Sequence, residues 1–226
     1  MSTKKRLRIG TLLHAPPLPP PFLACTRFNN KTWQEYQHWK NTHQQTYEQI
    51  YQRPLKCIYG TPREISNIKI PPQARILVIE MNNDENKIEG IGEIINQTAS
   101  EVYRSPPTIP FRKIFSDRNY TRYIYIGNTR YASREELIRN NTEDAQYINK
   151  QLEAVVLPQH TDTIPDTPPP PSWGGGPTLE RLLFKGARHM KRGSGITQCS
   201  IDKLIYASPL KNTTKQKQQL QEQPQK

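Results

Sequence analysis

Proline is concentrated in two short segments of the chain, and this distribution limits how much of the sequence can fold. Five of the 21 prolines lie between Pro16 and Pro21, and seven lie between Pro158 and Pro177. Because proline fixes φ and lacks an amide proton, neither segment suits a helix interior or a central strand. We therefore expect a basic, proline-rich flexible arm at 1–21 and a Pro/Gly-rich inserted loop at 158–177.

The rest of the sequence divides into a folded part and a tail. The tail, 209–226, is rich in glutamine and lysine and is expected to be disordered. Apolar residues make up only 34% of the 226 residues and the mean hydropathy is −0.83, too low for the whole chain to form one packed core. We expect a single domain built from 22–157 and 178–208.

Positive charge outweighs negative charge in the chain as a whole, but unevenly. The 32 lysines and arginines exceed the 20 acidic residues, which gives a net charge of +12 and a pI near 9.7. The surplus gathers in residues 1–8 (net +4), 104–134 (net +6) and 180–192 (net +4), whereas residues 80–93 carry a net −4. This distribution predicts a basic face and an acidic edge. A basic face favours polyanions as partners, nucleic acid before acidic membrane surfaces.

Several protein classes lack their signatures in this sequence. No stretch approaches the roughly 18 apolar residues that span a bilayer, and prolines break the start where a signal peptide needs an apolar core. No P-loop, GxSxG, HExxH or paired CxxC occurs, so we expect no enzyme activity, cofactor, metal centre or membrane contact. The separated cysteines Cys25, Cys57 and Cys199 suit a reducing, intracellular compartment.

The first expected helix covers residues 31–52. Thr32 and Glu35 form a T-x-x-E capping box, and Pro54 ends the segment. Large side chains recur inside it at three-to-four spacing, which predicts a buried face formed by Trp33, Tyr36, Tyr47, Ile50 and Tyr51.

Two further helices are expected later in the chain. Ser133 and Glu136 form a second capping box, which predicts a helix of about 20 residues. Its later apolar face is Ile148, Leu152, Val155 and Val156. Thr178 is positioned to cap a third helix, which Gly193 and Gly195 would end.

A β-hairpin is expected in the middle of the sequence. The branched, apolar run ARILVIEM (74–81) and the run IEGIGEII (88–95) flank the turn-like NNDENK. Gly90 and Gly92 within the second run indicate a bulge or the close approach of another backbone.

Two blocks of sequence resemble known proteins. The stretch CIYGTPREISNIKIPPQARILVIEMNNDENKIEGIGEI (57–94) resembles the opening of a PUA-like fold of the EVE, ASCH and YTH kind, in which a strand leads into a hairpin with a G-x-G on its return strand. RYIYIGNTRYASREELI and LERLLFKGARHMKRGSGIT resemble the end of uncharacterised proteins from large DNA viruses of algae and protists. Here segment 158–177 interrupts the helix that joins these two motifs in that group.

The PUA-like resemblance implies a fold and a mode of binding. It implies an α+β protein with a small, partly open β-barrel flanked by helices. It also implies binding of RNA, or of modified bases in DNA or RNA, with one base stacked in an aromatic-lined pocket. The viral resemblance implies action in the host cytoplasm or nucleus. Neither resemblance transfers a base-contacting role to a numbered residue of this chain.

The block FKGARHMKRGSG (184–195) is the first candidate for nucleic-acid binding. Its cations are Lys185, Arg188, Lys191 and Arg192, with His189 among them. Glycines on either side let backbone amides approach a phosphate. Like charges packed so closely cost stability, which favours a role in binding an anion. The alternative is a solvated helix end whose cations favour the negative end of the helix dipole.

A second candidate is the aromatic and basic run RNYTRYIYIGNTRY (118–131). It is flanked by the strand candidate PFRKIF (110–115), and TRYIYIGNTRYAS (121–133) predicts two strands joined by a Gly-Asn turn. Alternation along the strand places Tyr123 and Tyr125 on one face, where they would stack bases while arginines hold phosphates. The alternative is a half-buried strand. The residues proposed for contact are Arg118, Arg122, Tyr123, Tyr125 and Arg130.

Other candidates are weaker. Glu89 and Glu93 would suit a divalent metal or acid–base chemistry, as in a nuclease, but alternation favours solvated charges on a hairpin face. A zinc site would need the scattered residues Cys57, Cys199 and His160. Trp33 and Trp39 would line a pocket or pack the first helix.

The sequence thus predicts a non-enzymatic nucleic-acid-binding protein that contacts DNA or RNA through the phosphate backbone. The alternative is a virion or assembly protein that docks through its Pro-rich and Gln-rich segments. In that case PPPPSW would be a polyproline II ligand for an aromatic groove of a partner protein.

Overall fold

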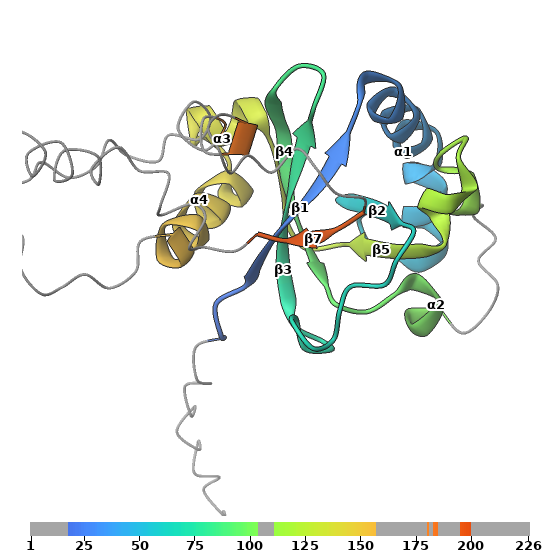
Figure 1. Ribbon diagram of the computed structural model, residues 1–226, viewed down its shortest axis with the longest axis horizontal. Helices are drawn as coiled ribbons and strands as arrows, with labels where there is room; N and C mark the ends of the chain where they lie inside the picture. Colours follow the sequence, from blue (N-terminus) through green and yellow to red (C-terminus); the bar gives the residue numbers. More distant parts are fainter. Residues whose placement is uncertain (1–17, 104–110, 157–179, 181–182, 185–194, 200–226) are drawn as a thin grey trace, which may run out of the picture.

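The computed structural model describes residues 18–103, 111–156, 180, 183–184 and 195–199. These residues form a mixed α+β fold, as expected. A five-stranded sheet stands between two groups of helices, with α3 and α4 on one side and α1 and α2 on the other (Figure 1). A two-stranded ribbon lies on the α1 side.

The larger sheet has the strand order β6-β4-β3-β1-β7. β1 and β3 are parallel, and every other neighbouring pair is antiparallel. The strands span β1 (Phe22–Phe28), β3 (Arg75–Asn82), β4 (Lys87–Ile95), β6 (Tyr131–Ser133) and β7 (Thr197–Gln198). β7, from the described part of the C-terminal segment, is thus an edge strand that pairs with β1.

The ribbon pairs β2 (Cys57–Thr61) with β5 (Tyr123–Gly127) in antiparallel register. Its inner face packs on the sheet, because an added Cβ at Gly92 of β4 would meet the Cys57 sulfur at 2.5 Å. Sheet and ribbon together enclose a core, but no closed barrel forms among the described strands.

Three hydrophobic clusters correspond to these layers. The first fills the space between the sheet and the helices α3 and α4, with Leu77, Ile79 and Ile148 among its members. The second lies between the sheet and the inner face of the ribbon, where Val78 meets Tyr59 and Tyr125. The third lies between the outer face of the ribbon and α1, and it is rich in aromatic rings.

The first helix, α1 (Asn30–Tyr51), is confirmed, but its cap differs from the prediction. Asn29 is the N-cap: its side chain accepts from the amide of Thr32, and the Thr32 hydroxyl accepts from the Asn29 amide. Glu35 instead accepts from the amide of Ser116 at 3.2 Å. Because Asn is as good an N-cap as Ser or Thr, the helix begins after Asn29, about one turn before the predicted cap at Thr32.

The hairpin of β3 and β4 is confirmed, and both roles suggested for its glycines are present. The register shifts next to Glu80, so that Glu89 is the extra residue of a bulge. An added Cβ at Gly90 would lie 2.5 Å from the hydroxyl oxygen of Tyr131, and one at Gly92 would collide with the hydroxyl of Tyr59.

One strand prediction and one predicted strand pairing are wrong. Residues 110–115 include a 3-10 helix, η1 (Phe111–Lys113), because Phe111, Ile114 and Phe115 are buried together at helical spacing. Residues 121–133 do form β5 and β6, but these strands do not pair with each other. At Gly127 the chain passes from the ribbon to the sheet, and an added Cβ there would collide with the Glu93 carbonyl.

The helix expected after Ser133 is two helices, α3 (Arg134–Arg139) and α4 (Glu143–Val156). The Ser133–Glu136 capping box is confirmed. The break lies at Asn140, whose φ of 51° is left-handed. The Asn149 amide holds this turn by donating to the Leu137 carbonyl at 3.1 Å and to the Asn140 side chain at 3.0 Å.

Most of the expected flexible segments and of the third helix lie outside the described residues. Residues 180, 183 and 184 of that helix are described, and they are helical as predicted. The described part of 178–208 packs on the rest of the domain: Leu183 and Phe184 are buried against the sheet. Two short elements complete the fold, α2 (Ala99–Val102) and η2 (Arg118–Thr121).

Candidate functional site

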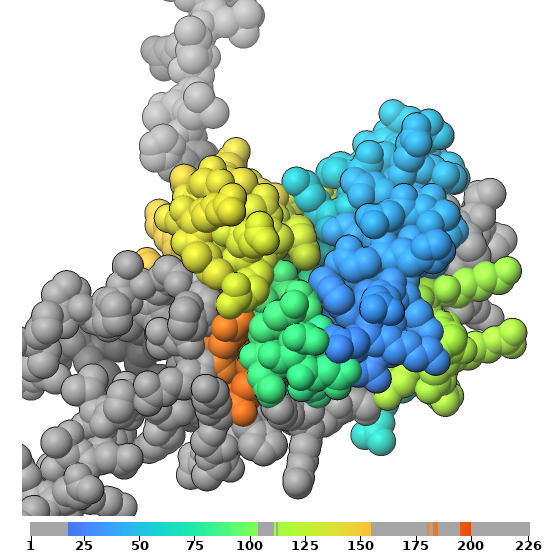
Figure 2. All heavy atoms as spheres, turned by 90° about the horizontal axis from the view of Figure 1, so that it is seen from above, coloured from blue at the N-terminus to red at the C-terminus, as the bar shows by residue number. Residues whose placement is uncertain are grey.

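A pocket of about 320 Å³ opens between β1 and β2, where the five-stranded sheet and the ribbon separate. Five segments that are far apart in the sequence meet there. Figure 2 shows the β3–β4 turn in green beside the start of α1 in blue. The lining residues are Thr26, Arg27, Phe28, Asn29, Thr32, Tyr59, Gly60, Asn83, Asp84, Phe115, Tyr120 and Gly195.

Four of the twelve residues that line the pocket are aromatic. Phe28 ends β1, Tyr59 lies in the middle of β2, and Phe115 and Tyr120 come from the segment around η2. Gly60 brings that segment close, because an added Cβ would lie 3.1 Å from the Phe115 ring and would collide with the Tyr120 carbonyl. The sequence therefore needs a residue without a side chain at this point of β2.

Polar groups lie at the rim of the pocket. The Asp84 carboxylate accepts from the amide of Asn30 at 2.9 Å, so the first turn of α1 is already bound to an acid. The Arg27 guanidinium donates to the Thr197 hydroxyl at 2.8 Å, and burial lowers the pKa of this arginine. The charges of Cys25 and Cys199, on the α3–α4 side of the sheet, act on this guanidinium, which therefore lies on that side. A ligand in the pocket would meet the Asp84 carboxylate.

A buried carboxylate, Glu80 of β3, lies behind the pocket wall. Its side chain is fully buried and accepts hydrogen bonds from three tyrosine hydroxyls. Tyr36 of α1 and Tyr59 of β2 donate to Oε1 at 3.2 and 2.9 Å, and Tyr131 of β6 donates to Oε2 at 3.1 Å. We call these four residues the Glu80–tyrosine cluster. It ties together one helix and strands of both sheets.

Two opposing effects act on the ionisation of Glu80. Burial raises its pKa above the usual range, whereas the charge of Lys40 and the three tyrosine donors oppose that rise. Lys40 lies with its Nζ 4.2 Å from the centre of the Tyr131 ring. Burial also raises the pKa values of Tyr36, Tyr59 and Tyr131, so these hydroxyls remain protonated and able to donate.

Two of the residues expected to bind nucleic acid lie beside the pocket. Arg118 begins η2, and Arg122 follows it; both side chains are exposed. The guanidinium carbon of Arg122 lies 5.6 Å from the centre of the Tyr123 ring, which is half-buried. Tyr120, between the two arginines, is 37% exposed and lines the pocket.

The structure corrects the expectation for Tyr125. This side chain is fully buried between the ribbon and the sheet, and its hydroxyl accepts from the amide of Ile65 at 2.9 Å. Alternation along β5 is as predicted, but α1 covers the outer face while the sheet covers the inner one. Tyr125 therefore has no surface on which a base can stack.

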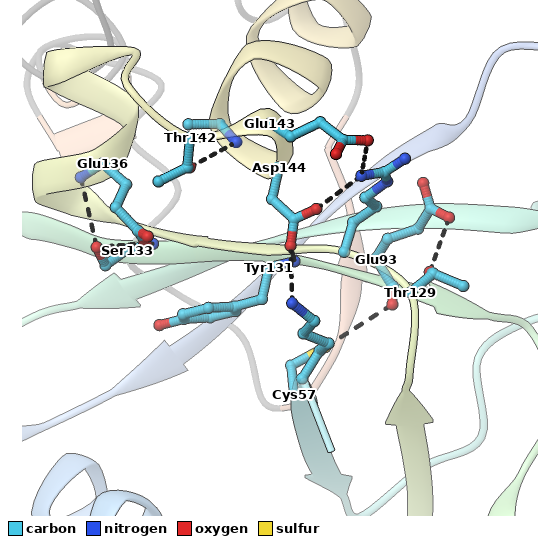
Figure 3. Close-up of polar contacts among 12 residues, drawn as sticks. Cys57, Glu93, Thr129, Tyr131, Ser133, Glu136, Thr142, Glu143 and Asp144 are labelled. Carbon is cyan, nitrogen blue, oxygen red and sulfur yellow. Dashed lines mark hydrogen bonds and ion pairs between the residues drawn. The ribbon is translucent and has the colours of Figure 1, made fainter. Parts of the chain in front are cut away.

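Arg130 is also used inside the molecule, which corrects its expected role. Its Nη1 lies 2.9 Å from Glu143 and 2.8 Å from Asp144, whose carboxylates Figure 3 shows. Its guanidinium carbon lies 4.9 Å from the centre of the Tyr147 ring. Asp144 accepts in addition from Lys56 and from the Tyr131 amide. These contacts join the start of α4 to the ribbon and the sheet and leave Arg130 unsuited to a phosphate.

Most of the candidate block at 184–195 lies outside the described residues. The residues outside are, among others, Lys185, Arg188, His189, Lys191 and Arg192. Its two ends are described. Phe184 is buried in the cluster beneath α3 and α4, and Gly195 lines the pocket. The block therefore connects the helical side of the sheet to the pocket.

The expected acidic edge is only partly present. Asp84 and Glu85 are exposed, but Glu80 and Glu93 are buried. Glu93 pairs with Arg75 at 2.9 Å, and Glu89 accepts from Asn82 at 2.7 Å. Within the described ranges, no group of three or more His, Cys, Asp or Glu side chains could hold a metal ion.

The three cysteines are free thiols on two sides of the sheet. Cys25 and Cys199 share a hydrogen bond on the α3–α4 side, whereas Cys57 lies in the core between sheet and ribbon. This separation excludes the zinc site that would combine Cys57 with Cys199. The two tryptophans pack in the α1 cluster, Trp39 fully and Trp33 at its margin.

Comparison of the chain with protein-family models, with curated proteins and with solved structures finds no match in any of the three. In the part of the chain that the structure describes, no helix is long and apolar enough to cross a membrane.

Sequence reasoning missed most of the pocket. Phe28, Tyr59 and Phe115 gave no local signal, because each looks like an ordinary core residue of a short strand or turn. Glu80 was counted as a surface charge, although an acid in the middle of the apolar run RILVIEM is a sign of a buried, hydrogen-bonded carboxylate.

Proposed function

We propose that this protein is a non-enzymatic nucleic-acid-binding protein that holds one unstacked base in the pocket between β1 and β2. The observation that carries the proposal is the pocket itself, a cavity of about 320 Å³ whose lining includes aromatic residues from β1, β2 and the η2 segment. We also propose a PUA-like, partly open barrel, which the enclosure of a core between sheet and ribbon supports.

The chemistry of the lining suits a nucleobase. Planar rings stack on aromatic side chains, and each stacked base contributes about 1–3 kcal/mol. The polar lining residues Thr26, Asn29 and Asp84 present donors and acceptors to the edge of a base, as in single-stranded recognition. The cavity volume lies at the lower end of the range for small-ligand sites, which is about 300–1,000 Å³.

The charge of the chain supplies the other half of the proposal. Arg118 and Arg122 flank Tyr120 at the mouth of the pocket, and Lys113 is exposed on the same segment. The net charge of +12 supports long-range attraction of a phosphate backbone. The basic block that ends at Gly195 is proposed to add phosphate contacts next to the bound base.

A binding assay with two alanine variants tests the pocket. Tyr120→Ala removes a partly exposed ring from the pocket and should weaken binding of a short single-stranded oligonucleotide about tenfold or more. Tyr51→Ala is the matched control, because it removes a ring from the far end of α1, about 30 Å from the first turn. Equal affinities for both variants and the parent would remove the pocket from the proposal. The assembly-protein alternative would then lead.

A further inference from the structure

We propose that Glu80 is the positioning residue of the pocket, and that its ionised carboxylate holds the pocket wall in the binding-competent arrangement, so that base binding is linked to a proton on Glu80. This inference rests on the proposed function, because it concerns the pocket that would hold the base. It adds a regulation by pH that the pocket lining alone does not imply.

One carboxylate oxygen of Glu80 is connected, directly or through Tyr36, to two of the residues that line the pocket. Oε1 of Glu80 accepts from both Tyr36 and Tyr59. Tyr59 is one of the lining residues, and the Tyr36 ring is stacked on its ring with 6.5 Å between ring centres and an interplanar angle of 11°. Tyr36 also packs at 5.4 Å on Phe28, the opposite aromatic wall. A change in the charge of Glu80 therefore affects the packing of both Tyr59 and Phe28.

The charge state of Glu80 decides whether all three tyrosines can donate to it. An ionised carboxylate is a pure acceptor with about four lone-pair sites, so three hydroxyls can donate at once. A protonated carboxyl must itself donate one hydrogen bond. At least one tyrosine hydroxyl must then accept this hydrogen bond instead of donating one. The proton of that hydroxyl needs a new acceptor within the buried site.

The groups that face Glu80 come from every element around it. From α1 these are Tyr36 and Lys40, from β2 Cys57 and Tyr59, and from β6 Tyr131. The residues beside Glu80 in the sheet are Thr26 of β1 and Gly90 of β4, neither of which is titratable. Lys40 is the only cation named among them, and it favours the ionised form. Burial works in the opposite direction and raises the pKa of Glu80.

The sign of the linkage follows. If the ionised form holds the pocket, binding is strong at pH values above the pKa of Glu80 and weakens as the pH falls through it. Burial places that transition at a higher pH than an exposed glutamate, which titrates near 4.3, would give.

The test measures affinity against pH for the parent protein and for Glu80→Gln. The probe is a short oligouridine, whose bases do not titrate in this range, carrying a dye whose emission is constant between about pH 5 and 8. We expect the parent to lose about tenfold in affinity toward the acid end. Glu80→Gln should bind as weakly as the acidic parent at every pH, because its amide also presents a donor.

Two further variants keep the test decisive. Tyr131→Phe removes the donor to Oε2, which favours the protonated carboxyl, and should move the loss of affinity to a higher pH. Tyr59→Phe keeps the ring in the pocket but removes its bond to Oε1, and it should weaken binding and flatten the pH profile; this variant decides the question if Glu80→Gln does not fold. A parent and Glu80→Gln with the same affinity and the same pH profile would overturn the inference and leave the proposed function intact. A parent that binds no single strand at any pH would overturn both.

Discussion

The packing of the core behind the pocket depends on two glycines and one glutamate. Gly90 and Gly92 of β4 leave the space into which the hydroxyls of Tyr131 and Tyr59 project, and both hydroxyls end on Glu80. The sequence did predict that these glycines mark a bulge or a close approach. It did not predict the partner, because the three tyrosines come from positions 36, 59 and 131 and meet only in the fold.

Gly92→Ala should destabilise the protein by about 1–3 kcal/mol, because its methyl group would overlap the Tyr59 hydroxyl and the Cys57 sulfur. Urea unfolding followed by far-UV circular dichroism measures the change. Ile95→Ala on the same strand is the control: this residue is 37% exposed, so its loss should be smaller. A Gly92→Ala variant as stable as the parent would show that the tyrosine cluster tolerates displacement.

The cysteines should be unreactive in the folded protein. Burial raises the pKa of Cys57 to about 12, so the thiolate is about one part in ten thousand at pH 8. The hydrogen bond with Cys199, together with burial, raises the pKa of Cys25 as well. Iodoacetamide followed by mass spectrometry should find all three thiols unmodified until denaturant is added. Fast labelling of Cys57 in the native state would contradict its burial.

At the scale of elements, sequence patterns predicted those features that depend on interactions between residues close in sequence. The capping box at Ser133, the amphipathic α1 and the β3–β4 hairpin all follow from residues close in sequence. The Gly127–Asn128 turn was misread as a hairpin, because its path depends on Gly127 packing against Glu93, a distant residue. β1 went unpredicted because FLACTRF is short and follows a run of prolines.

Asp144 holds the start of α4 against the ribbon and β6. Burial opposes its ionisation, but hydrogen bonds from Arg130, Lys56 and the Tyr131 amide outweigh burial and lower its pKa. A lowered pKa stabilises the fold fully above the unfolded value of about 3.9, and this stability is lost as the pH falls through the folded value. Asp144→Asn should therefore cost about 1–2 kcal/mol at pH 7.

The pH dependence separates this contribution from simple loss of packing. The free energy of unfolding of the parent should fall more steeply below about pH 4 than that of Asp144→Asn. Glu143→Gln is the matched control, because Glu143 pairs with the same arginine but its side chain is 84% exposed. Its effect should be near zero. Equal losses for the two variants would mean that Asp144 is no more than a surface partner.

At the scale of the whole molecule, the pocket exists only because the fold brings together residues near positions 28, 59, 84, 115 and 195. No local pattern predicts such a site. Composition did predict the excess of positive charge and the basic run that includes Arg118 and Arg122. The fold then separated that run into exposed cations beside the pocket and residues used internally, Tyr125 and Arg130.

Salt dependence tests the phosphate contacts. If Arg118 and Arg122 each neutralise one phosphate, replacing both with glutamine should reduce the log–log salt slope of single-strand binding by about 1.4 in total. Arg139→Gln removes an exposed cation from α3, on the opposite side of the sheet, and should leave the slope unchanged. Replacing Lys185, Arg188, Lys191 and Arg192 together should reduce the slope by about 3. Unchanged slopes in both multiple variants would exclude these cations from the interface.

The central claim is that a base enters the pocket between β1 and β2, and a nitrogen–proton correlation spectrum recorded during titration with a short single-stranded oligonucleotide tests it most directly. We predict saturable shifts concentrated at the amides of Gly60, Asn83 and Gly195, which line the pocket from three segments. The amides of Tyr51 and Ile138, at the end of α1 and on α3, should stay in place. Shifts that avoid the pocket amides, or no shifts at all, would contradict the account.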